Sequence, residues 1–331
     1  MKNFATNLAV ARSSDFPRTP RAAALVAPTA VRPAVLFALF EEGRPTASLL
    51  RALALSRVLD AELHVMRVLP ELARVNALFP QNNVRDAVRT VERTLQANRS
   101  TREWLASCLT LGDDEAAVER FSIAHGNFVE HVAGQAAELD AVLIIVPPRE
   151  GRMGRTVTSL ASTSGVPVLV AREATHDETI VAATDLESEG YPVLRRAAQL
   201  GQQLDAPVIA LHNVNPVSFV GGIGDAWPMM VLPGGPVREA RSARLSQISE
   251  SLPVDASAVI RNEVNPVDAI LGEARRHDAD LVVVGTRRRS WFDRLVTGSV
   301  AAQVVNRAKR SVLVTPLDDV GPLAVAPLAR A

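Results

Sequence analysis

The stretch Asp278–Thr286 reads DADLVVVGT and aligns without a gap with an earlier stretch, Asp140–Pro148, which reads DAVLIIVPP. Both contain a short run of branched apolar residues without polar alternation, which is typical of a strand buried on both faces of a parallel sheet. A helix with an apolar stripe precedes each run. The stripes consist of Val129, Val132, Ala133 and Ala136 in the first copy and of Val267, Ile270, Leu271 and Ala274 in the second.

The repeat extends outward from these two stretches. Ala34–Phe40 corresponds to Thr179–Asp185 as a first strand, and the last apolar runs are Val166–Ala171 and Ser311–Pro316. Each half therefore reads as five strands that alternate with helices, such as the one expected at Pro192–Leu204. The pattern predicts an α/β fold of two tandem Rossmann-like domains, each with a five-stranded parallel sheet flanked by helices.

The boundary between the halves lies in the charged stretch Arg172–Glu178, which predicts domains at residues 31–173 and 177–317. The ends, 1–30 and 318–331, are rich in Ala and Pro and lack periodicity, so we expect disordered tails. The first end also has the composition of a transit peptide, although we favour the tail. A Gly/Pro/Met stretch at Val220–Pro236 predicts a long mobile loop.

The composition argues against several classes of protein. Lys+Arg and Asp+Glu both number 36 in 331 residues, which gives a formal net charge of +0. Nucleic acid or an anionic membrane as main partner usually requires a basic excess. The apolar runs are far shorter than the roughly 18–20 residues that a bilayer needs. The single cysteine, Cys108, fits a reducing compartment such as the cytoplasm, and we expect it to be a small buried apolar residue.

The segment Asp280–Ala308 has the features of an anion site. A strand ends at Gly285, a loop follows, and a helix begins after Gly298 with Ser299 as a candidate N-cap. A helix N-terminus offers unpaired N–H groups and the positive end of its dipole, and glycine lets a phosphate approach the backbone. Ligands of open parallel sheets bind beyond the carboxyl ends of strands, where Gly285 and Asp185 would both lie.

This segment resembles the ATP-binding loop of the universal stress protein family, which carries Gly, two residues, Gly, nine residues, and then Gly-Ser or Gly-Thr. Gly285, Gly298 and Ser299 match three positions, and Arg288 replaces the second glycine. Asp185 matches the Asp that the family places beside the ribose and adenine. The resemblance implies strand order 3-2-1-4-5 in each half and pairing of the halves through their last strands. The result would be an intramolecular pseudo-dimer, compatible with a further homodimer.

The resemblance also implies a cytoplasmic stress-response protein that binds ATP, with or without Mg²⁺, in its second domain. Such a protein would act through nucleotide-dependent contacts with an unknown protein partner. We expect no catalytic residue and at most slow hydrolysis, since no Ser/His/Asp order, Cys/His pair or Walker lysine is present. The residues expected to contact the adenine nucleotide are Thr184, Asp185, Gly285, Thr286, Arg287, Arg288, Gly298, Ser299 and Val300.

The first half departs further from the family pattern. Pro147 and Glu150 stand at its glycine positions, and Phe40 stands where Asp185 stands in the second half. The Gly-Ser pair has become Leu160-Ala161, or Ser159 alone if one residue is deleted. We therefore expect a degenerate domain with a packing role, whose last helix is about one turn shorter than that of the second half.

Other interpretations stay open. If Arg288 closes the loop, the chain is a nucleotide-free scaffold of the same fold. An enzyme that activates a substrate through an adenine nucleotide ranks last, because no glycine loop follows the strand at Thr179–Asp185. The run Arg287–Arg289 fits either phosphate or nucleic-acid backbone, or a solvated loop. His64 and His212 lack partners at metal-ligand spacing, so we expect them to be ordinary strand residues.

Overall fold

The computed structural model describes residues 32–40, 43–71, 80–109, 116–149, 151, 153–173, 179–188, 191–214, 218–220, 229–231, 235–286 and 299–317. These residues belong to one compact unit, Arg32–Ala331. The predicted tails, the run Arg287–Arg289 and Gly298 lie outside the described residues. In the part of the chain that is described, no helix has both the length and the apolar character to cross a membrane.

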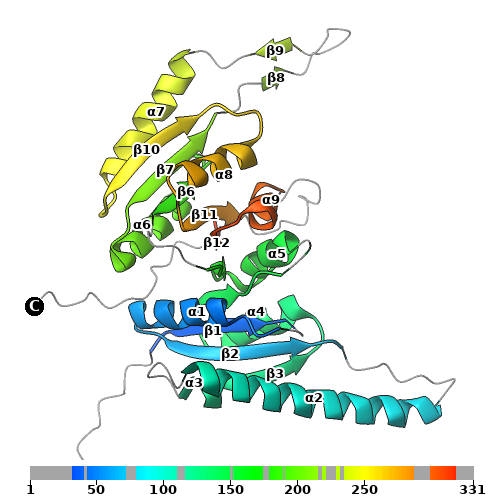
Figure 1. The fold of residues 1–331 in the computed structure, drawn as a ribbon. Coiled ribbons are helices and arrows are strands. Elements are labelled where there is room, and N and C mark those ends of the chain that lie inside the picture. Colours follow the sequence, from blue (N-terminus) through cyan, green and yellow to red (C-terminus); the bar gives the residue numbers. More distant parts are fainter. Residues whose placement is uncertain are drawn as a thin grey trace, which may run out of the picture. The chain divides into compact units, whose positions relative to one another are not determined.

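Each half alternates strands and helices, except that α3 follows α2 in the first half and two short strands follow β7 in the second (Figure 1). The first half runs through β1 (Ala34–Leu39), α1 (Thr46–Val58), β2 (Glu62–Leu69), α2 (Pro80–Leu109), α3 (Ala116–Glu119), β3 (Phe121–His125), α4 (Phe128–Glu138), β4 (Ala141–Val146), α5 (Gly154–Ser164) and β5 (Val168–Val170). The second half runs through β6 (Ile180–Ala183), α6 (Pro192–Leu204), β7 (Val208–Asn213), β8 (Ser218–Val220), β9 (Met229–Val231), α7 (Gly235–Glu250), β10 (Ala256–Arg261), α8 (Pro266–Arg276), β11 (Leu281–Thr286), α9 (Ser299–Arg307) and β12 (Ser311–Pro316).

The main strands form one 10-stranded sheet in the order β10-β7-β6-β11-β12-β5-β4-β1-β2-β3. Counted from the first strand of each half, this is the order 3-2-1-4-5 that the family resemblance implied. Within each half, neighbouring strands of this sheet are parallel. The halves join where β5 and β12 pair antiparallel, with Leu169 opposite Leu313. The expected α/β fold with a mostly parallel, helix-flanked sheet is therefore confirmed.

Helices cover both faces of the sheet, which explains why its strands lack polar alternation. Phe37 faces one buried cluster, which includes residues of α1, α2 and α6, and Leu36 faces the other, which includes residues of α4, α5, α8 and α9. Neither side chain is accessible to solvent. Burial of such a side chain stabilises the fold by roughly 1.5–3 kcal/mol. Cys108, near the end of α2, is also buried in the first cluster, as expected.

The start of α5 differs from the prediction. The last helix of the first half was expected to be the shorter one, but α5 has 11 residues and α9 has 9 in the described chain. The difference arises because α5 begins at Gly154, earlier than expected, where the backbone N–H donates to Oδ1 of Asn306 on α9 at 2.8 Å. A side chain on the other half therefore satisfies an N–H group at the start of the helix.

The stretch Val220–Pro236, expected to be one long loop, is partly regular. Its first residue, Val220, ends β8, and Met229–Val231 within it form β9, which pairs antiparallel with β8 and places Phe219 opposite Met230. Helix α7 already begins at Gly235. The loop prediction was therefore wrong for the residues of β8, β9 and α7, and residues 221–228 and 232–234 lie outside the described chain.

Candidate functional site

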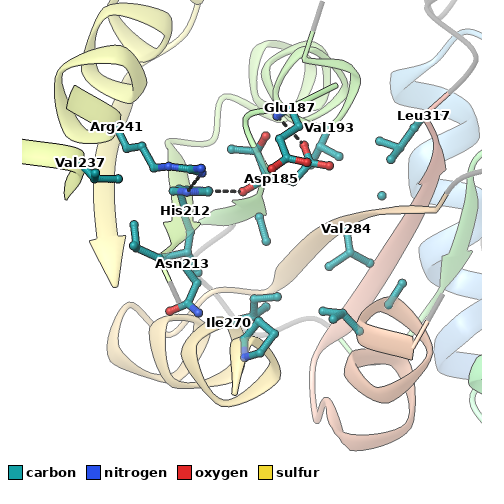
Figure 2. Close-up of a pocket in the computed structure, with 18 residues that line it drawn as sticks. Asp185, Glu187, Val193, His212, Asn213, Val237, Arg241, Ile270, Val284 and Leu317 are labelled. Atoms are coloured by element: carbon teal, nitrogen blue, oxygen red, sulfur yellow. Dashed lines mark hydrogen bonds between the residues drawn. The ribbon is translucent and has the colours of Figure 1, made fainter. Parts of the chain in front are cut away.

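A cavity of about 500 Å³ lies at the carboxyl ends of β6, β7 and β11, bounded by α6, α7, α8 and α9 (Figure 2). The sheet order runs outward in opposite directions from β6 and β11, which makes this the point at which strand order reverses. Ligands of open α/β sheets bind at such a point. Its apolar wall is formed by Val193, Leu211, Val214, Ile270, Val284 and Leu317.

The turn after β6 places a carboxylate at the cavity. Oδ1 of Asp185 accepts hydrogen bonds from the backbone N–H groups of Glu187 at 3.0 Å and Ser188 at 3.3 Å. The hydroxyl of Thr184 accepts from the N–H of Leu186 at 3.1 Å, and Leu186 has a φ of 61°. These short-range bonds compensate for the unusual backbone conformation. Asp185 is exposed and, with Glu187, makes this part of the lining acidic.

His212 is a cavity residue whose role the sequence did not reveal. It lies in β7 and is only 4% exposed. Its Nδ1 lies 2.8 Å from the carbonyl oxygen of Thr184, and its Nε2 lies 2.9 Å from Nη1 of Arg241. A carbonyl can only accept and a guanidinium can only donate, so Nδ1 carries the proton and Nε2 accepts. The ring is therefore held in one neutral tautomer.

Burial lowers the pKa of His212 and has the largest effect. The hydrogen bond to Thr184 opposes this shift, Arg241 reinforces it, and the carboxylates of Asp185 and Glu187 oppose it more weakly. The net direction is downward, which agrees with the neutral ring that the hydrogen bonds require.

Arg241 reaches the cavity from α7, and no sequence motif pointed to it. Helix α7 follows a stretch that was expected to be a loop. The position of Arg241 over β7 therefore depends on how α7 packs against the sheet. Figure 2 shows Arg241 and Val237 projecting from α7 towards His212. The only available signal was the presence of His212 at the end of a predicted strand, a place where ligands often bind.

The opposite end of the cavity is formed by β11 and the first turn of α9. Val300 and Ala301 line it, so the N-terminus of α9 adjoins the cavity. Gly285 also lines it, and a Cβ built there would lie 2.5 Å from Cδ2 of Leu317. A side chain at position 285 would therefore displace the side chain of Leu317 from its place against β11.

Thr286 has a different environment from its neighbour Gly285. It is 3% exposed, and its hydroxyl oxygen lies 3.4 Å from that of Ser162 on α5. The structure thus brings Thr184, Asp185, Gly285 and Val300 together at the cavity and places Thr286 against the first half. Ser299 begins α9, but its side chain is not described, and Arg287, Arg288 and Gly298 lie outside the described residues.

The corresponding place in the first half contains an aromatic pair. Phe40 follows β1 as Asp185 follows β6, and it stacks on Phe128, with ring centroids 4.2 Å apart and ring planes at 19°. Phe128 opens α4 as Pro266 opens α8. The guanidinium carbon of Arg149 lies 5.4 Å from the centre of the Phe40 ring. Stacked rings and a cation therefore replace the carboxylate and proline of the second half.

Residues 178–316 match the Universal stress protein family. A universal stress protein of Methanocaldococcus jannaschii is 26% identical over 136 residues, which is 41% of this chain and 79% of that protein. A solved universal stress protein from Archaeoglobus fulgidus DSM 4304 covers 86% of this chain and 98% of its own, at 14% identity and a TM-score of 0.57. This likeness shows the fold across both halves.

A second solved structure is the universal stress protein from Archaeoglobus fulgidus in complex with dAMP. It is 25% identical to this chain, covers 41% of this chain and 95% of its own, and has a TM-score of 0.30.

Proposed function

Since residues 178–316 contain a universal stress protein domain, we propose that the chain is a tandem member of that family that binds an adenine nucleotide in its second half. The proposed domains are a degenerate one at 31–173 and a nucleotide-binding one at 177–317. The proposed ligand is ATP, with or without Mg²⁺, and the proposed site is the cavity at β6, β7 and β11.

The observation that carries this proposal is that one cavity combines the three surfaces that a nucleoside phosphate needs. Apolar side chains such as Leu211 and Ile270 can cover a base, Asp185 can accept hydrogen bonds from ribose hydroxyls, and the N-terminus of α9 can bind phosphate. The cavity volume of about 500 Å³ lies within the usual range of roughly 300–1,000 Å³ for small-molecule sites.

The two ends of the cavity support one orientation of the nucleotide. The carboxylates of Asp185 and Glu187 disfavour phosphate near β6, whereas the backbone N–H groups at Val300 favour it near α9. We assign Gly298, Ser299, Arg287 and Arg288 to the phosphate end on the sequence match alone. Among the described residues, no three His, Cys, Asp or Glu side chains are grouped to hold a metal ion. Phosphate oxygens would therefore supply the main ligands of any Mg²⁺.

The first half has a packing role in this proposal. The Phe40–Phe128 stack stands where the second half has Asp185 and Pro266, so the residues described at that position present aromatic rings in place of a carboxylate that could accept from a ribose. Its last strand and helix instead support β12 and α9. The proposed physiological role is cytoplasmic and stress-related, through nucleotide-dependent contacts with a protein partner.

Calorimetric titration of the purified chain with ATP and Mg²⁺ tests the proposal, after a denatured sample has been checked for co-purified nucleotide. We expect one site per chain. Val300→Trp should abolish binding by filling the cavity, and Asp185→Ala should weaken it. Thr156→Trp, at the corresponding turn of α5 in the first half, is the matched control and should bind as the unchanged protein does.

Circular dichroism and melting curves establish that each variant is folded. Retained affinity in folded Val300→Trp would place the site elsewhere. Neither binding nor co-purified nucleotide in the unchanged protein would favour the nucleotide-free scaffold, with Arg288 closing the loop. Two sites per chain would contradict the degenerate first half.

A further inference from the structure

The N-terminal part of α2 presents apolar side chains to solvent in a regular pattern. Val84, Val88, Val91 and Leu95 are 69%, 51%, 58% and 65% exposed. Their spacings of four, three and four residues are those of alternating d and a positions in a coiled-coil heptad. At 3.6 residues per turn, the four side chains fall within an arc of about 60°. We call these four residues the α2 stripe.

The α2 stripe is separate from the face by which α2 packs on its own half. Thr101, Trp104, Leu105 and Cys108 bury the C-terminal part of the helix. Further towards the N-terminus, Oγ1 of Thr94 lies 3.0 Å from Nε2 of His125 on β3. This inward face is centred about 120° around the helix from the α2 stripe. In Figure 1 the N-terminal turns of α2 extend past the strands.

We propose that the α2 stripe is a self-association surface that receives α2 of a second copy of this chain as a short antiparallel coiled coil. With Val88 opposite Val91 of the second copy, Val84 faces Leu95 and the two apolar seams coincide along their whole length. The inference does not depend on nucleotide binding, because α2 belongs to the first half and does not line the cavity.

Charge complementarity favours a second copy as the occupant. The positions that flank the α2 stripe on its solvent side are Arg85, Glu92 and Arg99. In the antiparallel register, Arg85 lies beside Glu92 of the second copy, and the two-fold axis generates this pair twice. Opposite charges at such flanking positions set partner choice and orientation in coiled coils.

A parallel pair has no such complementarity. Flanking pairs in a parallel coiled coil would set Ala87 beside Glu92 and Thr94 beside Arg99 of the other helix. A parallel pair would also bring the two protein bodies together, because the C-terminal part of each α2 is buried against its own half. The antiparallel arrangement places the bodies at opposite ends of the paired helices.

The dimer is expected to be weak. Only about two heptads contribute, so the interface falls below the roughly 1,200–2,000 Å² that stable complexes bury. We therefore expect the dimer to dissociate with a constant on the order of 10–100 μM.

Sedimentation equilibrium of the full chain, at concentrations spanning that value, tests the proposal. We expect a monomer–dimer equilibrium that Val88→Glu combined with Val91→Glu abolishes, without a change in the melting temperature. Val264→Glu is the matched control, since Val264 is 69% exposed outside α2, and it should leave the equilibrium unchanged.

A charge swap tests the antiparallel register. Glu92→Arg and Arg85→Glu should each weaken the dimer about threefold to tenfold by creating like-charge pairs, and the double variant should restore it. A monomer at all concentrations overturns the proposal. So does a dimer that withstands Val88→Glu with Val91→Glu, or a double charge swap that fails to restore association.

Discussion

Nη1 of Arg241 on α7 lies 2.9 Å from Nε2 of His212 on β7 (Figure 2). Because Nδ1 of the same ring lies 2.8 Å from the carbonyl of Thr184, Nε2 can accept from Arg241 only while the ring is neutral. Protonation of His212 would set two cations against each other in a buried place, so the contact between α7 and the strand depends on pH.

We expect the free energy of unfolding to decrease as the pH falls below the ordinary histidine pKa of about 6.5. The folded protein lowers the pKa of His212, so the unfolded chain binds more protons between the two pKa values, and stability rises with pH there. The contribution is fully present above the unfolded pKa and is lost as the pH falls through the folded pKa. Urea unfolding at a series of pH values measures it.

His212→Gln removes the titrating group and should reduce this pH dependence. His131→Gln, on α4, is the control and should leave it unchanged. An equally steep loss of stability in His212→Gln would contradict the role assigned to His212.

Gly285→Ala should destabilise the protein by about 1–3 kcal/mol, because the new Cβ overpacks the contact between β11 and Leu317. That Cβ would lie 2.5 Å from Cδ2 of Leu317 and 3.0 Å from Cγ2 of Val193. Gly272→Ala in α8 is the matched control. A Cβ there has no atom within 4 Å, and it should stabilise the helix by roughly 0.5–1 kcal/mol.

The combination of Gly285→Ala with Leu317→Ala separates this clash from other causes. If the contact with Leu317 is responsible, the double variant loses less stability than the sum of the two single variants. Strictly additive losses in urea unfolding would argue against it.

Gly154→Ala should cost about 3 kcal/mol, the upper end of overpacking effects, because the obstacle is backbone and not a flexible side chain. The new Cβ would lie 2.0 Å from the carbonyl oxygen of Ala302 on α9, which forces the two helices apart. Gly134→Ala in α4 has free space around its Cβ and should be neutral or stabilising. Similar melting temperatures for both variants would show that the α5–α9 contact is looser than described.

Arg172→Met should destabilise the chain by about 1–2 kcal/mol, since it leaves carbonyl acceptors without their donor. The guanidinium of Arg172 donates to the carbonyls of Arg310 at 3.0 Å and Val305 at 3.1 Å, so the first half caps the C-terminal end of α9. Arg155→Met, at an exposed position of α5, is the control for the charge change. A difference of less than a few tenths of a kcal/mol between the two variants, measured by urea unfolding, would refute the cap.

The sequence predicted the strands well because their pattern is local. A run such as Leu281–Val284 can be stable only where both faces are covered, and the structure buries it. The bounds of α6, Pro192–Leu204, were also predicted, since a proline at its start and an apolar stripe are local signals. The strand order came from the family resemblance and not from the pattern.

The candidate site was predicted in part. Asp185 and Gly285 could be placed because they end strands, and the ends of parallel strands meet at one edge of a sheet. Thr286 was expected beside them but packs against Ser162 of the other half. Successive side chains of a strand point to opposite faces of the sheet, and the sequence does not reveal which element packs on each face.

By itself the sequence determined the repeat, the buried strands and the helix that follows the glycine loop, because each depends on the spacing of apolar residues or on a glycine. Only the tertiary structure decided where α5 begins, which side chain faces His212 and what stacks on Phe40. In each case the residue that makes the contact is far away in the sequence and belongs to no sequence motif. Asn306 is 152 residues from Gly154, and a hydrogen bond between such residues exists only once the sheet has brought their helices together.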